Sequence, residues 1–183
     1  QALYWRYAEE IISSTFSSYG YQEIRFPIVE STELFHRSNQ ASDMVSKEMY
    51  TFEDKGGDSL SLRPEGTASC VRACIENNLL RVDTPRLWYN GPMFRYERPQ
   101  KGRSRQFHQS SVEVFGIEGP EIDAEIIKLS SRLWKRLGIE DTVYLEINSI
   151  GNESTRLRYT EDLLKYFQPL KDQLDEDILK KLN

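Results

Sequence analysis

Cysteine, histidine and long hydrophobic runs are scarce in this 183-residue chain. Cys70 and Cys74 have no Cys or His partners at the spacing of a zinc site, since His36 and His108 are the only histidines. We therefore expect two thiols in the hydrophobic core rather than a disulfide or a metal site, as is usual in a reducing cytoplasm. No apolar run approaches the ~20 residues that span a bilayer, so we expect no membrane segment.

Positive charge is also in deficit over the whole chain. Lys and Arg number 24 against 29 Asp and Glu, for a formal net charge of -5. This balance argues against a uniform basic coat for nucleic acid, so basic clusters have to be interpreted locally. The length suits one soluble domain with a sizeable core. The chain begins at Gln1 and ends at "DEDILKKLN", and we expect both ends to be cuts in a longer protein.

Periodic patterns along the chain predict an α+β fold, an antiparallel β-sheet flanked by helices. A turn at Lys55-Gly56-Gly57 indicates a hairpin, and Thr67 is the expected N-cap of the helix that follows it. Residues 30–48 are expected to form a loop with short helical pieces. The expected helices are 3–19, ended by Gly20; 67–80; 121–137, ended by Gly138; and a segment from Glu153 onward. The expected strands are 21–27, the two arms of the hairpin, 86–97, 105–116 and 142–148.

The strand pair 86–97 and 105–116 carries an unusual basic stretch, "FRYERPQKGRSRQFHQSSVEVFG". Alternate residues of a strand share a face, so Arg95 points with Glu97. On the second strand, one face carries Phe107, Gln109, Ser111 and Glu113. Guanidinium forks suit phosphate oxygens, and an aromatic ring suits a planar base. The amide and carboxylate suit an amine, so the pattern indicates a nucleotide beside an amino-bearing small molecule. A solvated hairpin and a contact to an RNA backbone remain alternatives.

A second polar cluster, "LRPEGT", lies where a strand passes into a helix. Glu65 there has two interpretations of equal weight. It complements the helix dipole, or it presents its carboxylate, with the hydroxyl of Thr67, to a ligand ammonium.

These motifs together resemble the class II aminoacyl-tRNA synthetases. "GYQEIRFPIVE", about residues 20–30, resembles their motif 1, and "FRYERPQKGRSRQF", within about 91–116, resembles motif 2. The ordered combination of "LRPEGT", motif 2, "RQFHQ" and "LEINSIG" is similar to bacterial histidyl-tRNA synthetases over essentially the whole chain. The resemblance implies a partial class II catalytic domain over residues 1–183, a homodimer built around motif 1 and a cytoplasmic location.

The resemblance also implies chemistry and site residues. Histidine would attack the α-phosphate of ATP, with Mg²⁺ as the counter-ion of ATP and no protein-held metal, and histidine tRNA would accept the product. The catalytic Arg95 would hold the α-phosphate, and Arg103 would reach the β- and γ-phosphates. Glu97 would touch the adenine amino group or orient Arg95, and Phe107 would stack on adenine. The implied histidine-binding residues are Glu65, Thr67 and Gln109 for the α-amino group and Glu113 for the imidazole N–H.

The sequence departs from the family at Ser111, where the family usually has Gly, between Gln109 and Glu113. Its added hydroxyl either crowds the histidine pocket or is absorbed by a small shift. The Arg-Gly-Leu-Asp-Tyr-Tyr element, motif 3 with its ATP-binding Arg and the anticodon-binding domain do not occur in the 183 residues. We therefore expect this chain on its own to have little or no aminoacylation activity.

Two other functions compete with this interpretation. A non-catalytic paralogue that regulates ATP phosphoribosyltransferase shares the synthetase fold, but it has no need to keep motif 2 and "RPEGT" together. An RNA-binding module using the hairpin alone predicts a steep salt dependence of RNA affinity and no specific ATP binding.

Overall fold

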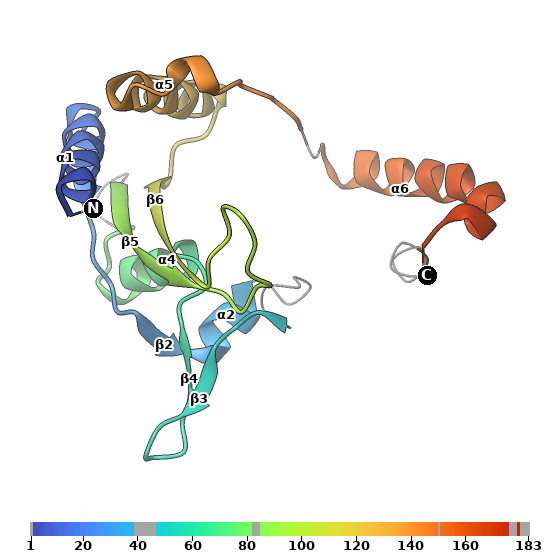
Figure 1. Cartoon of the computed structure of the whole chain (residues 1–183), viewed down its shortest axis with the longest axis horizontal. Helices are drawn as coiled ribbons and strands as arrows, with labels where there is room; N and C mark the ends of the chain where they lie inside the picture. The colour runs from blue at the N-terminus through green and yellow to red at the C-terminus, as the bar shows by residue number, and fades with distance from the viewer. Residues whose placement is uncertain (1, 39–46, 82–84, 150, 176–178, 180–183) are drawn as a thin grey trace. The chain divides into compact units, whose positions relative to one another are not determined.

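The computed structural model describes residues 2–38, 47–81, 85–149, 151–175 and 179 (Figure 1). The chain divides into two units, Gln1–Val143 and Tyr144–Asn183. All the residues proposed above for ATP and histidine belong to the first unit. Among the helices of the described ranges, none has both the length and the apolar character of a membrane span.

A long antiparallel hairpin forms the centre of the first unit, as the sequence predicts. Strand β5 (Arg86–Phe94) pairs with β6 (Gln106–Val114), and Tyr89 lies directly opposite Ser111. The expected strand 21–27 is shorter, because only β1 (Gln22–Glu23) has strand geometry. It pairs with β5 in parallel, so this sheet is mixed rather than purely antiparallel.

A second, smaller sheet contains the predicted Gly-Gly hairpin. Its strands β2 (Val29–Ser31), β3 (Thr51–Glu53) and β4 (Ser59–Leu62) run in the order β2-β4-β3 and are antiparallel. The carboxylate of Asp54 closes the turn, since its Oδ1 accepts hydrogen bonds from the backbone N–H of Gly56 at 2.7 Å and of Asp58 at 3.0 Å.

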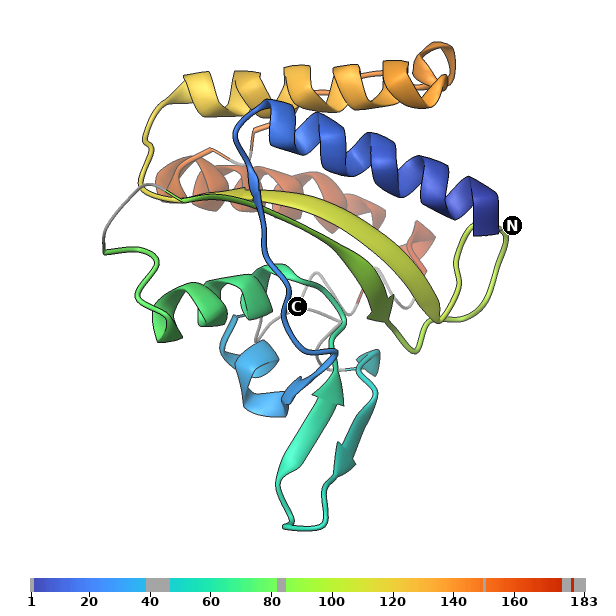
Figure 2. The same cartoon turned by 90° about the vertical axis from the view of Figure 1, so that its left-hand side faces the viewer.

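The helices cover the two faces of the β5–β6 hairpin (Figure 2). Helices α1 (Ala2–Ser18) and α5 (Pro120–Leu137) lie on one face, where Phe16, Tyr21, Trp88 and Leu129 form a buried cluster. Helix α4 (Thr67–Glu76) lies on the other face, where Cys70, Cys74, Leu87, Tyr89 and Met93 form a second cluster.

Most helix boundaries agree with the sequence pattern, but α4 ends at Glu76 and not at the predicted residue 80. Helix α1 is followed by Gly20 at φ +83°, and α5 ends at Gly138 in the left-handed conformation. The expected loop at 30–48 contains helix α2 (Thr32–Ser38), and its residues 39–46 lie outside the described ranges. A short 3-10 turn, η1 (Glu140–Thr142), follows α5.

The second unit contains α6 (Glu153–Phe167) and the 3-10 segment η2 (Gln168–Gln173). Asn152 caps α6, because its Oδ1 accepts a hydrogen bond from the backbone N–H of Thr155 at 2.9 Å. The predicted strand 142–148 is wrong: Thr142 belongs to η1, and no strand is assigned to the residues from 143 to 149. No strand of the described residues pairs with this segment, and a strand needs a hydrogen-bonded neighbour to form.

Candidate functional site

Strand β6 turns Phe107, Gln109, Ser111 and Glu113 toward one face of the sheet. All four are half-buried, whereas the alternating residues Gln106, His108 and Ser110 are exposed. The shared face predicted from the period of two is therefore confirmed. The same face of β5 carries Leu87, Tyr89 and Met93 of the core cluster that packs against α4.

Glu113 is the centre of a hydrogen-bonded group at one end of this face. Its Oε1 accepts a hydrogen bond from Thr67 Oγ1 at 2.8 Å and another from the hydroxyl of Tyr89 at 3.3 Å. Burial raises the pKa of Tyr89 to about 12, so its hydroxyl remains a proton donor at neutral pH. These contacts join β5, β6 and the start of α4 at a single carboxylate.

Tyr89 is a site residue that sequence reasoning missed. It is 2% exposed and was indistinguishable from a core aromatic in the pattern of β5. The one available signal was the register of the hairpin, which places Tyr89 opposite Ser111. Cross-strand partners lie close enough for their side chains to meet, so a correct register assigns Tyr89 to the polar face.

Gln109 and Ser111 are joined within the same face. Gln109 Nε2 donates a hydrogen bond to Ser111 Oγ at 3.0 Å. Across from Gln109, strand β5 carries Gly91, which has no side chain to compete for the amide. The serine that departs from the family pattern is therefore a hydrogen-bond partner of Gln109.

The start of α4 is capped by Glu65 and not by Thr67. Gly66 occupies the N-cap position, so the predicted capping role of Thr67 is wrong. Glu65 accepts from the backbone N–H of Thr67 at 2.5 Å and of Ala68 at 2.9 Å. The carboxylate therefore complements the positive end of the helix, and these bonds fix its orientation. An ionised carboxylate has about four acceptor positions, so further donors can still bind.

The four residues proposed for ATP lie together at the other end of the hairpin. Strand β5 ends at Phe94, but the backbone N–H of Arg95 still donates to the Arg105 carbonyl at 2.9 Å. The guanidinium of Arg95 lies over the ring of Phe107, with Cζ 5.0 Å from the ring centre. Its Nε donates to the carbonyl of Pro64 at 2.8 Å.

Glu97 brings the two arginines of this group together. Its carboxylate lies 3.9 Å from Arg95 Nη1 and 3.4 Å from Arg103 Nη1. The side chain of Arg103 is 64% exposed, so its ion pair with Glu97 is screened and contributes little to stability. The same weakness means that a phosphate can take Arg103 from Glu97 at small cost.

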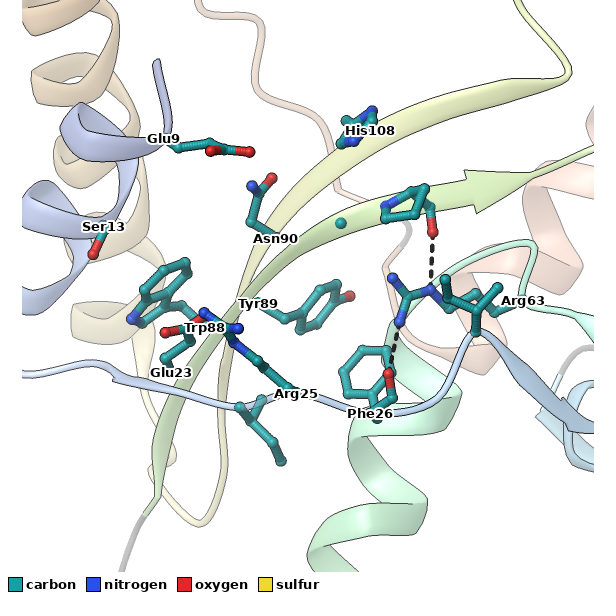
Figure 3. A pocket seen from close by; sticks show the side chains of 14 residues that line it. Glu9, Ser13, Glu23, Arg25, Phe26, Arg63, Trp88, Tyr89, Asn90 and His108 are labelled. Atoms are coloured by element: carbon teal, nitrogen blue, oxygen red, sulfur yellow. Dashed lines mark hydrogen bonds and ion pairs between the residues drawn. The ribbon is translucent and has the colours of Figure 1, made fainter. Parts of the chain in front are cut away.

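A separate cleft of about 620 Å³ opens near β1 and β5, and Arg63 closes one side of it (Figure 3). The Arg63 side chain is buried, and its Nε donates to the Pro92 carbonyl at 2.9 Å. Its Nη1 donates to the carbonyls of Phe26 at 3.0 Å and Pro27 at 3.3 Å. Arg63 thus ties the segment after β1 to β5. None of the sequence-predicted ligand residues lines this cleft.

The two cysteines lie in the hydrophobic core. Cys70 and Cys74 are free thiols buried in the core cluster beside Tyr89, as predicted. Burial raises the pKa of the Cys70 thiol to about 12, so it is an inert core group at neutral pH. Over the described ranges there is no group of three His, Cys, Asp or Glu side chains that could hold a metal ion.

Comparison with known proteins shows which family and which solved structures this chain is similar to. A family model described as histidyl-tRNA synthetase matches residues 1–153. The apo histidyl-tRNA synthetase of S. aureus is 39% identical, with a TM-score of 0.71, over 98% of this chain and 42% of its own length. The chain thus spans less than half the length of that relative.

Two other solved structures share the fold. One, described as an ATP phosphoribosyltransferase regulatory subunit/histidyl-tRNA synthetase from Bacillus halodurans C, is 25% identical over 73% of this chain and 33% of its own, with a TM-score of 0.63. A pyrrolysyl tRNA synthetase of Desulfitobacterium hafniense has a TM-score of 0.60 over 72% of this chain and 46% of its own, at 15% identity, which shows likeness of fold alone.

Proposed function

Because the chain belongs to the histidyl-tRNA synthetase family, we propose that it forms part of the catalytic domain of a histidine–tRNA ligase. In the proposed reaction the carboxylate of histidine attacks the α-phosphate of ATP. The products are histidyl-adenylate and pyrophosphate, and the histidyl group then passes to the 3′ end of histidine tRNA. As the chain spans 42% of the S. aureus synthetase, we expect the 183 residues alone to have little activity.

One observation carries the proposal: the same strand face has a guanidinium over an aromatic ring at one end and a hydrogen-bonded carboxylate at the other. Arg95 lies over Phe107 at one end, and Glu113 holds two hydroxyl donors at the other. Glu113 lies six positions after Phe107 on β6, which is about 20 Å of extended chain. That length accommodates an adenylate with an amino acid attached.

At the ATP end, Arg95 is proposed to bind the α-phosphate and to neutralise the charge that develops there during attack. Such preorganised charge is usually the largest electrostatic contribution to catalysis. Arg103 is proposed to bind the β- and γ-phosphates after leaving Glu97, and Phe107 to stack on adenine. Stacking requires Arg95 to leave the ring face that it now covers, or adenine to use the other face. Mg²⁺ would accompany ATP and neutralise its phosphates.

At the histidine end, the side chains present acceptors for cationic and N–H groups. Glu65, Thr67 and Gln109 are proposed to bind the α-ammonium, and Glu113 to accept a hydrogen bond from the imidazole N–H. The hydrogen bonds that Glu113 already accepts keep its carboxylate oriented. Positioning of two reactants, rather than covalent chemistry by the protein, would then supply the acceleration.

We further propose a homodimer through the segment 20–30, histidine tRNA as acceptor and a cytoplasmic location. Ile28 and Val29 of that segment are 41% and 40% exposed in the single chain, which supports burial against a second copy. The two free thiols support a reducing compartment. Sedimentation of the purified protein tests the dimer. If the proposal is correct, the measured mass is twice that of one chain.

The decisive test is histidine-dependent ATP–pyrophosphate exchange by the complete protein encoded with this chain. We expect Arg95→Ala to lower the exchange rate by about 10²–10³, the usual loss when one charge-stabilising donor is removed. Arg132→Ala is the matched control, because Arg132 is exposed on α5, on the face of the hairpin opposite to the proposed ligand residues. An unchanged rate in Arg95→Ala would contradict the assigned role.

The likeness to the Bacillus halodurans protein favours one alternative, a regulatory subunit of ATP phosphoribosyltransferase. That function predicts histidine binding without any pyrophosphate exchange. The same assay therefore separates the two, provided that histidine binding is measured in parallel by calorimetry.

A further inference from the structure

The hydroxyl of Ser111 stands between two polar side chains of the candidate site. On its own strand it accepts the hydrogen bond from Gln109 Nε2 at 3.0 Å. Across the hairpin it lies directly opposite Tyr89, whose hydroxyl donates to Glu113 at 3.3 Å. Ser111 thus lies between Gln109 and the group around Glu113 on one face of the sheet.

The hydrogen bonds on this face have definite donors. The Tyr89 hydroxyl donates its single proton to Glu113 Oε1 at 3.3 Å. The amide Nε2 of Gln109 carries two protons and donates one of them to Ser111 Oγ at 3.0 Å.

Because Nε2 of Gln109 is directed to Ser111, the amide oxygen Oε1 points away from that hydroxyl. Within the described part of the chain, no hydrogen bond to Gln109 Oε1 is found. Ser111 in this way determines which end of the amide, two positions away on the same strand, remains open to a ligand.

From this geometry we propose that Ser111 is a positioning residue that locks the amide of Gln109 with its carbonyl oxygen toward the α-ammonium of histidine. The inference rests on the proposed function and extends it, because Ser111 itself touches no substrate. A glycine at position 111 leaves the amide free to rotate. A flipped amide presents N–H donors, which repel an ammonium.

Binding of two ligands by the complete protein tests the proposal. Histidine carries the α-ammonium, and 3-(imidazol-4-yl)propanoate lacks it but keeps the imidazole and the carboxylate. We expect Ser111→Ala to weaken histidine binding about tenfold, the equivalent of one well-formed hydrogen bond, and to change analogue binding by less than about twofold. Ser111→Thr keeps the hydroxyl and is expected to retain the preference for histidine.

A second variant separates positioning from general packing. Gln109→Ala should show the same selective loss, and Ser111→Ala should add nothing in that background, since both changes remove one interaction. The KM for ATP should stay within about twofold in every variant, because the ATP residues share no hydrogen bond with Ser111.

The outcomes distinguish the inference from the function on which it rests. Equal weakening of histidine and its analogue overturns the inference, as does an unchanged histidine affinity in Ser111→Ala with normal exchange in the wild type. Both results leave the proposed function intact. A wild type that neither exchanges pyrophosphate nor binds histidine overturns the function and the inference together.

Discussion

Replacing Gly66 by alanine tests how the tyrosine of the site is held in place. Gly66 has φ -110° and ψ -17°, which alanine also adopts, so the backbone itself tolerates the change. A Cβ built there would lie 2.2 Å from Tyr89 Cε2, 2.5 Å from Cζ and 2.7 Å from the hydroxyl oxygen. The Tyr89 ring must therefore move for Gly66→Ala to fold.

The ring has little room to move. Tyr89 is 2% exposed, and its ring centre is 5.0 Å from that of Phe26 on one side. Overpacking of this kind typically costs about 1–3 kcal/mol. Loss of the hydrogen bond from Tyr89 to the Glu113 carboxylate adds about 1.5–3 kcal/mol. A gain of about 0.4–1 kcal/mol from the stiffer unfolded chain offsets part of this cost.

We therefore expect Gly66→Ala to lower the free energy of unfolding by about 3 kcal/mol. With a slope of about 2 kcal/mol/M, the midpoint of urea unfolding falls by about 1.5 M. Fluorescence of Trp88, which is 5% exposed in the core, reports the transition. Gly56→Ala in the exposed hairpin turn is the matched control and is expected to change stability by less than about 0.5 kcal/mol.

A double mutant makes the reasoning refutable. Tyr89→Leu removes the three atoms that lie nearest the added Cβ, so Gly66→Ala should cost little in that background. The steric argument fails if Gly66→Ala leaves the midpoint unchanged, or if it costs as much with leucine at position 89 as with tyrosine.

Two further predictions concern groups outside the ligand residues. Arg63→Met keeps the side-chain length but removes the buried donor shared by the backbone carbonyls of Phe26, Pro27 and Pro92. We expect a loss on the order of 3 kcal/mol in urea unfolding, about 1 kcal/mol for each hydrogen bond. The control Arg25→Met, at a side chain that is 85% exposed, should lose almost none. Tyr21 donates to Glu125, and burial raises its pKa from 10.0 to about 12. Because a raised pKa favours the neutral folded form, its contribution to stability is complete below pH 10 and is lost as the pH rises to 12. Tyr21→Phe should therefore flatten the fall in unfolding free energy over that range, and an unchanged slope would contradict the burial argument.

The sequence by itself determined the features that depend on near neighbours. The ends of α1 and α5 follow from Gly20 and Gly138, whose backbone conformations suit glycine. The long hairpin follows from two alternating runs joined by a polar loop, and its period of two correctly assigned Phe107, Gln109, Ser111 and Glu113 to one face. The ordered motifs indicated the synthetase family, which the family model confirmed.

Tertiary structure alone decided which side chains form hydrogen bonds with one another. The segment 142–148 alternates apolar and polar residues as a strand does, but it lacks a hydrogen-bonded neighbouring strand among the described residues. Thr67 is a residue type that often caps helices, yet its hydroxyl donates to Glu113, and Glu65 caps the helix instead. The bonds of Tyr89 and Thr67 to Glu113 join residues 24 and 46 positions apart. Local propensity carries no information on such pairs, because they form only when the sheet and α4 pack together.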